Sequence, residues 1–366
     1  MYTTQGDDVG DEARPVGLAI VGAGLMGSQH ARSAAACPDV ELVGVHAAAV
    51  DQAVELSQRH EVDHIGSMDA LLEDDRIEAV LIATPTSTHD ELAAIAMAHG
   101  RHVFVEKPVT RTLQDALMLR RTARATGRVL GVGHVIRYFP EYRAIRDAIE
   151  RGDVGTPAVA TFGRRCQQPD WAPDRWHTDM GRSGGVAVDM LIHDVDLVRW
   201  YFGDPTEVYA RVVGSDTYAG LDYALATLTV PDGPICHLHG SWAEPDGFSQ
   251  QAEVCGTGGM LSYDSRGRDE LAFAVHGSSD AATALPPPPV GANDPFGMQL
   301  SDFARAIRTG APMPGDIDWA IGSLRIALAM LESSEQRDAV TLEPLADVLA
   351  REDEAATAAA GAGGAR

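Results

Sequence analysis

The residues of this sequence that most clearly predict a chemistry begin with the glycine turn Gly22-x-Gly24-x-x-Gly27. The apolar run of residues 16–21 leads into it, and the helix-compatible residues 28–36 follow. Strand, glycine turn and helix in this order are the context of a dinucleotide-binding site. Gly22 permits the tight turn, Gly24 lets a pyrophosphate approach the backbone, and Gly27 allows close packing of helix and strand. The free N–H groups of the helix N-terminus would then face the phosphates.

Asp189 and His193 are four residues apart, so a helix would place both on one face. A histidine there can accept the proton of a substrate hydroxyl while hydride leaves the carbon for a nicotinamide. Lys107 follows a predicted strand, at the carboxyl edge of a sheet where such folds bind ligands. Its ammonium group could hold the substrate oxygen and stabilise the charge that develops on it.

Other interpretations of these residues remain open. Asp189 and His193 could be a pair on a helix surface, or two ligands of a metal site with Asp196 as the third. Lys107 taken alone could be an ordinary solvated lysine. We favour catalysis and expect no metal.

Polar and aromatic side chains that could line a sugar-sized pocket occur at two places. One is the crossing between the two halves of the chain, and the other is the polar loop of residues 164–184. The candidates are His134, Arg137 and Tyr138 at the crossing, and Arg175, Trp176 and His177 in the loop. Plain packing is the alternative for both groups. His237 and His239 alternate along one strand and are expected to be solvated or at an interface.

The first half of the chain alternates strand and helix patterns, which predicts a doubly wound parallel sheet through about residue 133. Strands are predicted at residues 16–21, 40–45, 79–83, 103–105 and 129–132, with helices at 28–36, 51–60, 69–72, 91–99 and 113–126.

The second half has consecutive strand patterns with few helices, which predicts a large, open, mostly antiparallel sheet in an α+β domain. Strands are predicted at residues 158–162, 208–213, 224–230, 235–242, 253–256 and 271–275, and helices at 141–150, 296–308 and 319–333. We expect a nucleotide-binding domain at 15–133, a substrate-binding and oligomerisation domain at 134–345, and disordered tails at 1–14 and 346–366.

The composition excludes several classes of function. The 366 residues carry a net charge of −24, which disfavours nucleic acid and anionic membranes as partners. Four scattered cysteines form no CxxC motif, which is typical of a reducing compartment and argues against a zinc site. No stretch has the pattern of a signal peptide or a membrane span, so we expect a cytoplasmic protein.

Three motifs together resemble the glucose–fructose oxidoreductase / inositol dehydrogenase (Gfo/Idh/MocA) family. They are the glycine turn, Val105-Glu106-Lys107-Pro108, and the stretch of residues 184–196 that contains Asp189, His193 and Asp194. The resemblance runs from about residue 16 to residue 342. It implies an N-terminal Rossmann domain, a nicotinamide cofactor, and Lys107, Asp189 and His193 as the catalytic residues. It also implies a homodimer or homotetramer built through the open sheet.

The resemblance and the glycine turn together give a set of expected ligand contacts. Expected cofactor contacts are Gly22, Gly24, Leu25, Met26, Gly27, Ala47, Thr84, Pro85, Glu106 and Lys107. Expected substrate contacts are Lys107, His134, Arg137, Tyr138, Trp176, Asp189 and His193.

The choice between NAD and NADP is left open by the sequence. An NAD-preferring site usually has an acidic residue about 20 positions after the last glycine, where it holds the ribose 2′-hydroxyl. That position is Ala47; beyond it the first acid is Asp51 and the first basic residue other than histidine is Arg59.

We therefore expect an NAD(P)-dependent dehydrogenase that oxidises a secondary hydroxyl of a sugar or cyclitol. Two alternatives use the same features. One is a lyase or hydrolase that oxidises its sugar transiently with bound NAD, and the other is a nucleotide-binding regulator without turnover.

Overall fold

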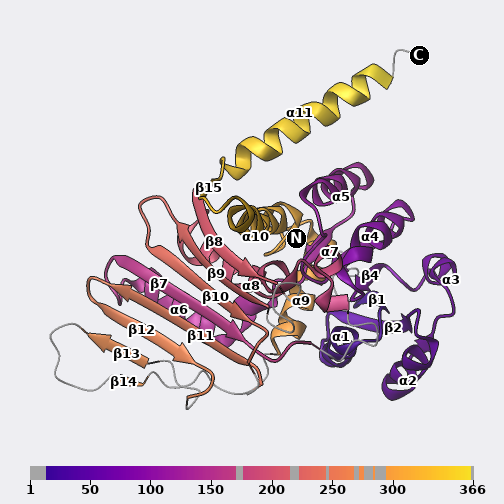
Figure 1. The fold of residues 1–366 in the computed structure, drawn as a ribbon. Coiled ribbons are helices and arrows are strands. Elements are labelled where there is room, and N and C mark those ends of the chain that lie inside the picture. The colour runs from indigo at the N-terminus through magenta and orange to yellow at the C-terminus, as the bar shows by residue number, and fades with distance from the viewer. Residues whose placement is uncertain are drawn as a thin grey trace, which may run out of the picture.

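The chain folds into two sheets that lie side by side, one of six strands and one of nine (Figure 1). The structure is a computed structural model that describes residues 14–169, 176–214, 222–244, 247–267, 272–275, 283–284 and 294–363. The predicted fold class, a doubly wound parallel sheet followed by a mostly antiparallel sheet, is confirmed. Within these residues no helix is long and apolar enough to cross a membrane.

The six-stranded sheet is parallel throughout, with the strand order β3-β2-β1-β4-β5-β6. Its strands are β1 (Val16–Val21), β2 (Val40–His46), β3 (Asp63–His64), β4 (Ala79–Ile82), β5 (His102–Val105) and β6 (Leu130–Val132). Every residue of β1 is buried, as expected for a parallel strand covered on both faces. The strand order reverses between β1 and β4, and the carboxyl ends of strands at such a point are the usual ligand site.

Helices cover both faces of this sheet. They are α1 (Leu25–Ala36), α2 (Val50–His60), α3 (Met68–Glu73), α4 (His89–Ala98) and α5 (Leu113–Thr126). Apolar residues of α1 and α2 share one core with Leu300 and Phe303 of α9 (Pro295–Thr309), so a late helix packs against the first sheet. Apolar residues of α3, α4 and α5 belong to the core on the other face.

The nine-stranded sheet has the order β14-β13-β12-β11-β7-β10-β9-β8-β15. Its strands are β7 (Pro157–Arg165), β8 (Glu207–Val213), β9 (Tyr223–Thr229), β10 (Ile235–Ser241), β11 (Ser249–Gly256), β12 (Gly259–Asp264), β13 (Ala272–Val275), β14 (Thr283–Ala284) and β15 (Val340–Thr341). The one parallel pair among these strands is β7 with β10, whereas the other recorded pairs are antiparallel. Burial alternates along β8, which is typical of a sheet that is covered on one face.

The covered face of this sheet packs against three helices, α6 (Pro140–Arg151), α8 (Ile192–Phe202) and α10 (Ile317–Gln336). The remaining short elements are α7 (Met180–Ser183), the 3₁₀ turns η1 (Thr86–Thr88), η2 (Val135–Tyr138) and η3 (Trp176–Thr178), and the π-helical turn η4 (Val186–Met190). The predicted division at residues 133 and 134 stays a prediction; β6 ends at Val132 and η2 begins at Val135.

Several parts of the chain differ from the sequence-based expectation, among them the short strands β3, β14 and β15, which were not predicted. β12 was not predicted, although its burial alternates strictly along the strand. The expected disordered tail at 346–366 is wrong for most of its length, because residues 345–363 form α11 (Leu345–Gly363), which projects from the body in Figure 1. Its first turns are held by ion pairs from α5: Arg120 bonds Asp353, and Arg121 bonds Glu352. The expected tail at the other end lies, apart from Arg14, outside the described residues.

The glycine turn between β1 and α1 has two crowded positions and one open one. Gly22 has φ +113°, a conformation that favours glycine, and a Cβ there would lie 2.4 Å from the carbonyl oxygen of Ala83. A Cβ on Gly27 would lie 1.9 Å from the carbonyl oxygen of Gly22. A Cβ on Gly24 would meet no described atom within 4 Å. The fold therefore requires glycine at 22 and 27 but not at 24.

This difference predicts a contrast between two variants. Gly27→Ala should lower the free energy of unfolding by about 1–3 kcal/mol, because a methyl group must displace backbone atoms. Gly24→Ser, which puts a favoured N-cap residue at the start of α1, should leave it unchanged or slightly raised. Urea denaturation of both variants measures the contrast, and equal stabilities would refute the packing role of Gly27.

Candidate active site

The predicted cofactor residues lie at the carboxyl ends of neighbouring strands. Gly22 follows β1, Thr84 and Pro85 follow β4, and Glu106 and Lys107 follow β5. Gly24 is the N-cap of α1, and no side chain caps this end of the helix. The first backbone N–H groups of the helix therefore remain available to an anion. The open space at Gly24 and these N–H groups fit a dinucleotide pyrophosphate.

The position expected to read the ribose is Ala47, directly after β2, and it is 8% exposed. The neighbouring His46 uses its ring Nδ1 in a hydrogen bond with the carbonyl oxygen of Ile65, at 2.9 Å. The residue at the end of β2 that is expected to contact the ribose therefore has no carboxylate. Leu25, in the first turn of α1, is 61% exposed.

Lys107 and Asp189 join the two halves of the molecule. The Lys107 ammonium donates to the backbone carbonyl of Asp189 at 2.8 Å and to its carboxylate at 3.2 Å. Both side chains are mostly shielded, with 16% and 14% exposed. Of the predicted catalytic residues, these two are brought into direct contact by the fold, although they are 82 positions apart.

Asp189 and His193 do not lie on one uninterrupted α-helix, as the sequence had indicated. Asp189 lies in the π-helical turn η4 and His193 in the first turn of α8. π-turns of this kind are frequent at functional sites because they offset the side chains around them. The motif therefore begins a helix, but only from Ile192 onward.

His193 is a candidate base with an unusual environment. Burial lowers the pKa of its imidazole well below the ordinary value, and the positive charge of Lys107 lowers it further. The ring is therefore neutral at physiological pH, which is the form that accepts a proton. Its Nδ1 is buried and has no hydrogen-bond partner among the described residues.

Glu106 lies directly before Lys107 and is buried. It accepts a hydrogen bond from the backbone N–H of Lys107 at 3.0 Å and one from His30 of α1 at 2.6 Å. Burial alone would raise the pKa of Glu106, but the bond from His30 and the nearby positive charges more than offset it, so the pKa lies below the ordinary value. This carboxylate links helix α1 to the strand end that carries Lys107.

The predicted pocket residues after β6 are engaged in buried contacts. The Arg137 guanidinium forms an ion pair with Asp196, which also accepts a hydrogen bond from the indole of Trp319 at 2.6 Å. His134 is 1% exposed, and its Nδ1 lies 3.5 Å from the same carboxylate. Asp196 is thus committed to this cluster and does not join Asp189 and His193 as a ligand, and no group of metal-binding side chains occurs among the described residues.

Tyr138 donates a hydrogen bond to Asp302 of α9 at 2.8 Å. Burial and this carboxylate raise the pKa of its phenol. The phenol therefore stays protonated and cannot accept a proton from a substrate. The structure therefore places Arg137 and Tyr138 in packing contacts that use their polar ends. Trp176 stacks on His177 in η3, at 3.8 Å between ring centroids, whereas Arg175 lies outside the described residues.

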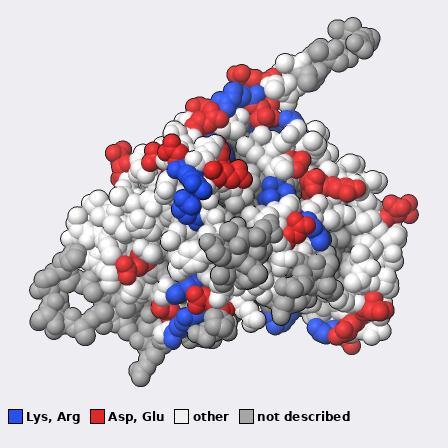
Figure 2. Space-filling model, viewed as in Figure 1, with Lys and Arg blue, Asp and Glu red and all other residues white. Residues whose placement is uncertain are grey.

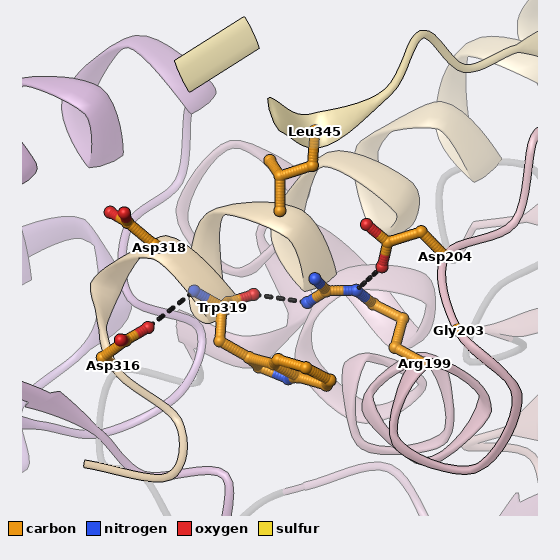
Figure 3. A pocket seen from close by; sticks show the side chains of 7 residues that line it. All are labelled: Arg199, Gly203, Asp204, Asp316, Asp318, Trp319 and Leu345. Atoms are coloured by element: carbon orange, nitrogen blue, oxygen red, sulfur yellow. Dashed lines mark hydrogen bonds and ion pairs between the residues drawn. The ribbon is translucent and has the colours of Figure 1, made fainter. Parts of the chain in front are cut away.

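A surface cavity lies on the far side of Trp319 (Figure 3). There the backbone of Trp319 bonds Asp316 and Arg199, and Arg199 pairs with Asp204. Its lining residues are distinct from Lys107, Asp189 and His193. The cavity therefore borders the Asp196 cluster without being part of the candidate active site.

Two buried histidines at the site were missed by sequence reasoning, His30 and His89. His30 bonds Glu106, and the ring of His89 lies between the carbonyl oxygens of Thr84 and Pro108. Each is a histidine in a helix of the parallel-sheet half, and only that unusual context could have marked them.

Comparison with known proteins agrees with this geometry. Residues 16–134 match the family model described as "Oxidoreductase family, NAD-binding Rossmann fold", and residues 142–262 match the "GFO/IDH/MocA C-terminal domain". The scyllo-inositol 2-dehydrogenase (NAD(+)) of Bacillus subtilis is 29% identical over 329 residues, which are 87% of this chain and 94% of that protein.

Two further similarities concern the cofactor. The scyllo-inositol 2-dehydrogenase (NADP(+)) IolW of Bacillus subtilis is 26% identical over 301 residues, 76% of this chain and 83% of that protein. The crystal structure of GenD2 from gentamicin A biosynthesis in complex with NAD has a TM-score of 0.78 and 26% identity, and the match covers 94% of this chain and 100% of that chain. The chain therefore belongs to the GFO/IDH/MocA family of oxidoreductases.

Proposed function

We propose that this protein is an NAD(P)-dependent dehydrogenase that oxidises a secondary hydroxyl of a cyclitol or sugar to a ketone, reversibly. The observation that carries the proposal is the contact of Lys107 with Asp189 beside a neutral His193. The relatives named inositol dehydrogenases support a cyclitol as the substrate class.

The side chains have distinct roles in this proposal. Neutral His193 accepts the proton of the substrate hydroxyl, and protonated Lys107 stabilises the negative charge that develops on the oxygen. Asp189 holds the Lys107 ammonium in position toward the substrate. The nicotinamide, when bound, supplies the acceptor for the hydride.

Two alternative functions would use the same residues: a lyase or hydrolase with transient oxidation, and a regulator without turnover. A panel of cyclitols and sugars with NAD and NADP, followed at the nicotinamide absorbance, separates them. Net reduced cofactor from a free polyol supports the dehydrogenase. Cofactor binding without net reduction for any polyol would contradict it.

The state of the protein in the cell is also part of the proposal. Its four cysteines are unpaired in the structure, which is consistent with a cytoplasmic location.

We propose a homodimer or homotetramer that forms through the uncovered face of the nine-stranded sheet. On that face Val159, Tyr209, Leu225 and Ile235 expose apolar side chains from neighbouring strands. The same face also carries the charged side chains of Glu207, Arg211 and Glu253, and the charged atoms over these strands are scattered in the view of Figure 2.

The first prediction concerns the proton. His193→Ala should lose about 10²–10⁴-fold in kcat, the range for a positioned acid–base group, and still bind cofactor. In the wild type, kcat/KM should rise with pH through a pKa below about 6.5, because burial and Lys107 disfavour the imidazolium. Lys107→Met should move this acidic limb to higher pH, since it removes one of the charges that lower the pKa.

pH–rate profiles with one good polyol measure both effects. His99→Ala, which removes an exposed histidine at the C-terminal end of α4, is the matched control and should keep wild-type kinetics. An unchanged acidic limb in His193→Ala would show that another group accepts the proton.

The second prediction concerns cofactor choice. With Ala47 at the ribose-reading position, the wild type should bind NAD and NADP with similar affinity. Ala47→Asp should shift the preference toward NAD by about 1–3 kcal/mol, the scale of a hydrogen bond to a charged group.

Fluorescence titration with both cofactors gives the ratio of dissociation constants. Ala35→Asp, on an exposed position of α1 away from the strand ends, controls for added charge, and Gly24→Val should lose both cofactors by filling the open space. Strong wild-type rejection of NADP would assign the discrimination to another residue.

The third prediction tests the assembly. Leu225→Asp should convert the oligomer to a smaller species, because a charge would be buried in the interface. Met118→Asp, at an exposed apolar position of α5, should leave the oligomer intact. Light scattering coupled to size-exclusion chromatography measures both masses, and a monomeric wild type would refute the proposed interface.

A further inference from the structure

We propose that His89 is a positioning residue that fixes the backbone at Lys107 through its ring Nδ1 contact with Pro108. The inference rests on the proposed function, because it assumes that the Lys107 ammonium acts on the substrate oxygen.

The ring of His89 joins the ends of two neighbouring strands. His89 is the first residue of α4 and is 1% exposed. Its Nδ1 lies 2.9 Å from the carbonyl oxygen of Pro108, and its Nε2 lies 3.0 Å from that of Thr84. Because β4 and β5 pair in parallel with Ile82 opposite Val105, both carbonyl groups belong to the same edge of the sheet.

The loop after β4 is closed by hydrogen bonds of its own. The hydroxyls of Thr84 and Thr88 are hydrogen-bonded at 2.7 Å, and the Thr88 hydroxyl donates to the carbonyl of Pro85 at 2.8 Å. This loop and α4 therefore form a fixed base from which His89 reaches across to Pro108.

The backbone at Lys107 is held from both sides. Its N–H donates to the Glu106 carboxylate at 3.0 Å, and the carbonyl of the following residue, Pro108, faces the His89 ring. The Lys107 side chain is long, so a small displacement of its backbone would move the ammonium away from Asp189. Displacements of about 1 Å in a catalytic group can cost about 10²-fold in rate.

A neutral His89 ring can donate a hydrogen bond to only one of its two carbonyl partners. Both partners are carbonyl oxygens and can only accept, whereas a neutral imidazole carries one N–H. Burial lowers the pKa of His89, so the ring is neutral and donates to one carbonyl at a time. Only the contact with Pro108 bears directly on Lys107, and it can be tested separately from the contact with Thr84.

Two amide variants separate these contacts. In His89→Asn the side-chain amide nitrogen takes the place of Nδ1 and can donate to Pro108. In His89→Gln it takes the place of Nε2 and can donate to Thr84. We expect His89→Asn to keep kcat within about threefold of wild type, and His89→Gln and His89→Leu to lose about 10–10²-fold. His89→Gln with kcat equal to or above that of His89→Asn would overturn the proposal.

A double-mutant cycle with Lys107 distinguishes positioning from a general loss of structure. Single-turnover rates should show that His89→Gln costs less than about threefold when Lys107 is already alanine, because the group it positions is gone. Full, additive loss in the Lys107→Ala background would overturn the proposal.

His102→Leu is the matched control. His102 lies at the opposite end of β5, where its ring accepts a hydrogen bond from the backbone N–H of Val129 at 3.0 Å. This variant should lose stability but keep kcat, and a kcat loss equal to that of His89→Gln would overturn the proposal. Wild-type turnover in both Lys107→Ala and His193→Ala would instead refute the roles that the proposed function gives to these two residues, whatever the order of the His89 variants.

Discussion

The ion pair between Lys107 and Asp189 is the constraint on which the candidate site depends. It connects the carboxyl edge of the parallel sheet to the π-helical turn before α8, so one contact sets the relation between the two halves of the site. Because both side chains are largely shielded from water, their attraction is screened less than that of a surface pair. Burial, together with the same lysine charge, lowers the pKa of His193 and so favours its neutral imidazole.

Helix α8 is held in place by two buried ion pairs at residues that follow His193. Asp194, directly after His193, pairs with Arg164 of β7 at 3.0 Å, and Asp196 pairs with Arg137 of η2. Each of these four side chains is almost fully buried. A buried charge without a partner would cost several kcal/mol, so these pairs resist any rotation of α8 that separates them. Three positions within four residues thus direct their side chains to three different parts of the molecule.

The parallel sheet has a similar arrangement around Lys107. Glu106 binds the backbone N–H of Lys107, His89 contacts the carbonyl of the following residue Pro108, and His30 holds Glu106. These contacts are made by polar side chains in otherwise apolar surroundings, where a hydrogen bond is strong and a missing partner is costly. The nine-stranded sheet, by contrast, leaves one face uncovered, and on it Val159, Tyr209, Leu225 and Ile235 expose apolar side chains.

The sequence by itself determined the fold class, most of the helices and strands, and the identity of Lys107, Asp189 and His193 as candidates. These follow from local patterns: strand and helix periodicity, a glycine turn, and short motifs. It also showed that alanine stands at position 47, where an NAD-preferring site usually has an acidic residue. It did not reveal β12, α11, or the π-helical turn that separates Asp189 from His193.

Only the tertiary structure decided how the polar residues are paired. Arg137 and Tyr138, candidates for a substrate pocket, are instead bound to Asp196 and Asp302. The place of the His89 ring between the carbonyl groups of Thr84 and Pro108 follows from the tertiary structure alone. The tertiary structure also decided that the pKa of His193 is lowered, because it buries the ring near Lys107. The physical reason is that burial and contacts between residues far apart in the chain set partners and protonation states, and local sequence patterns carry no information about either.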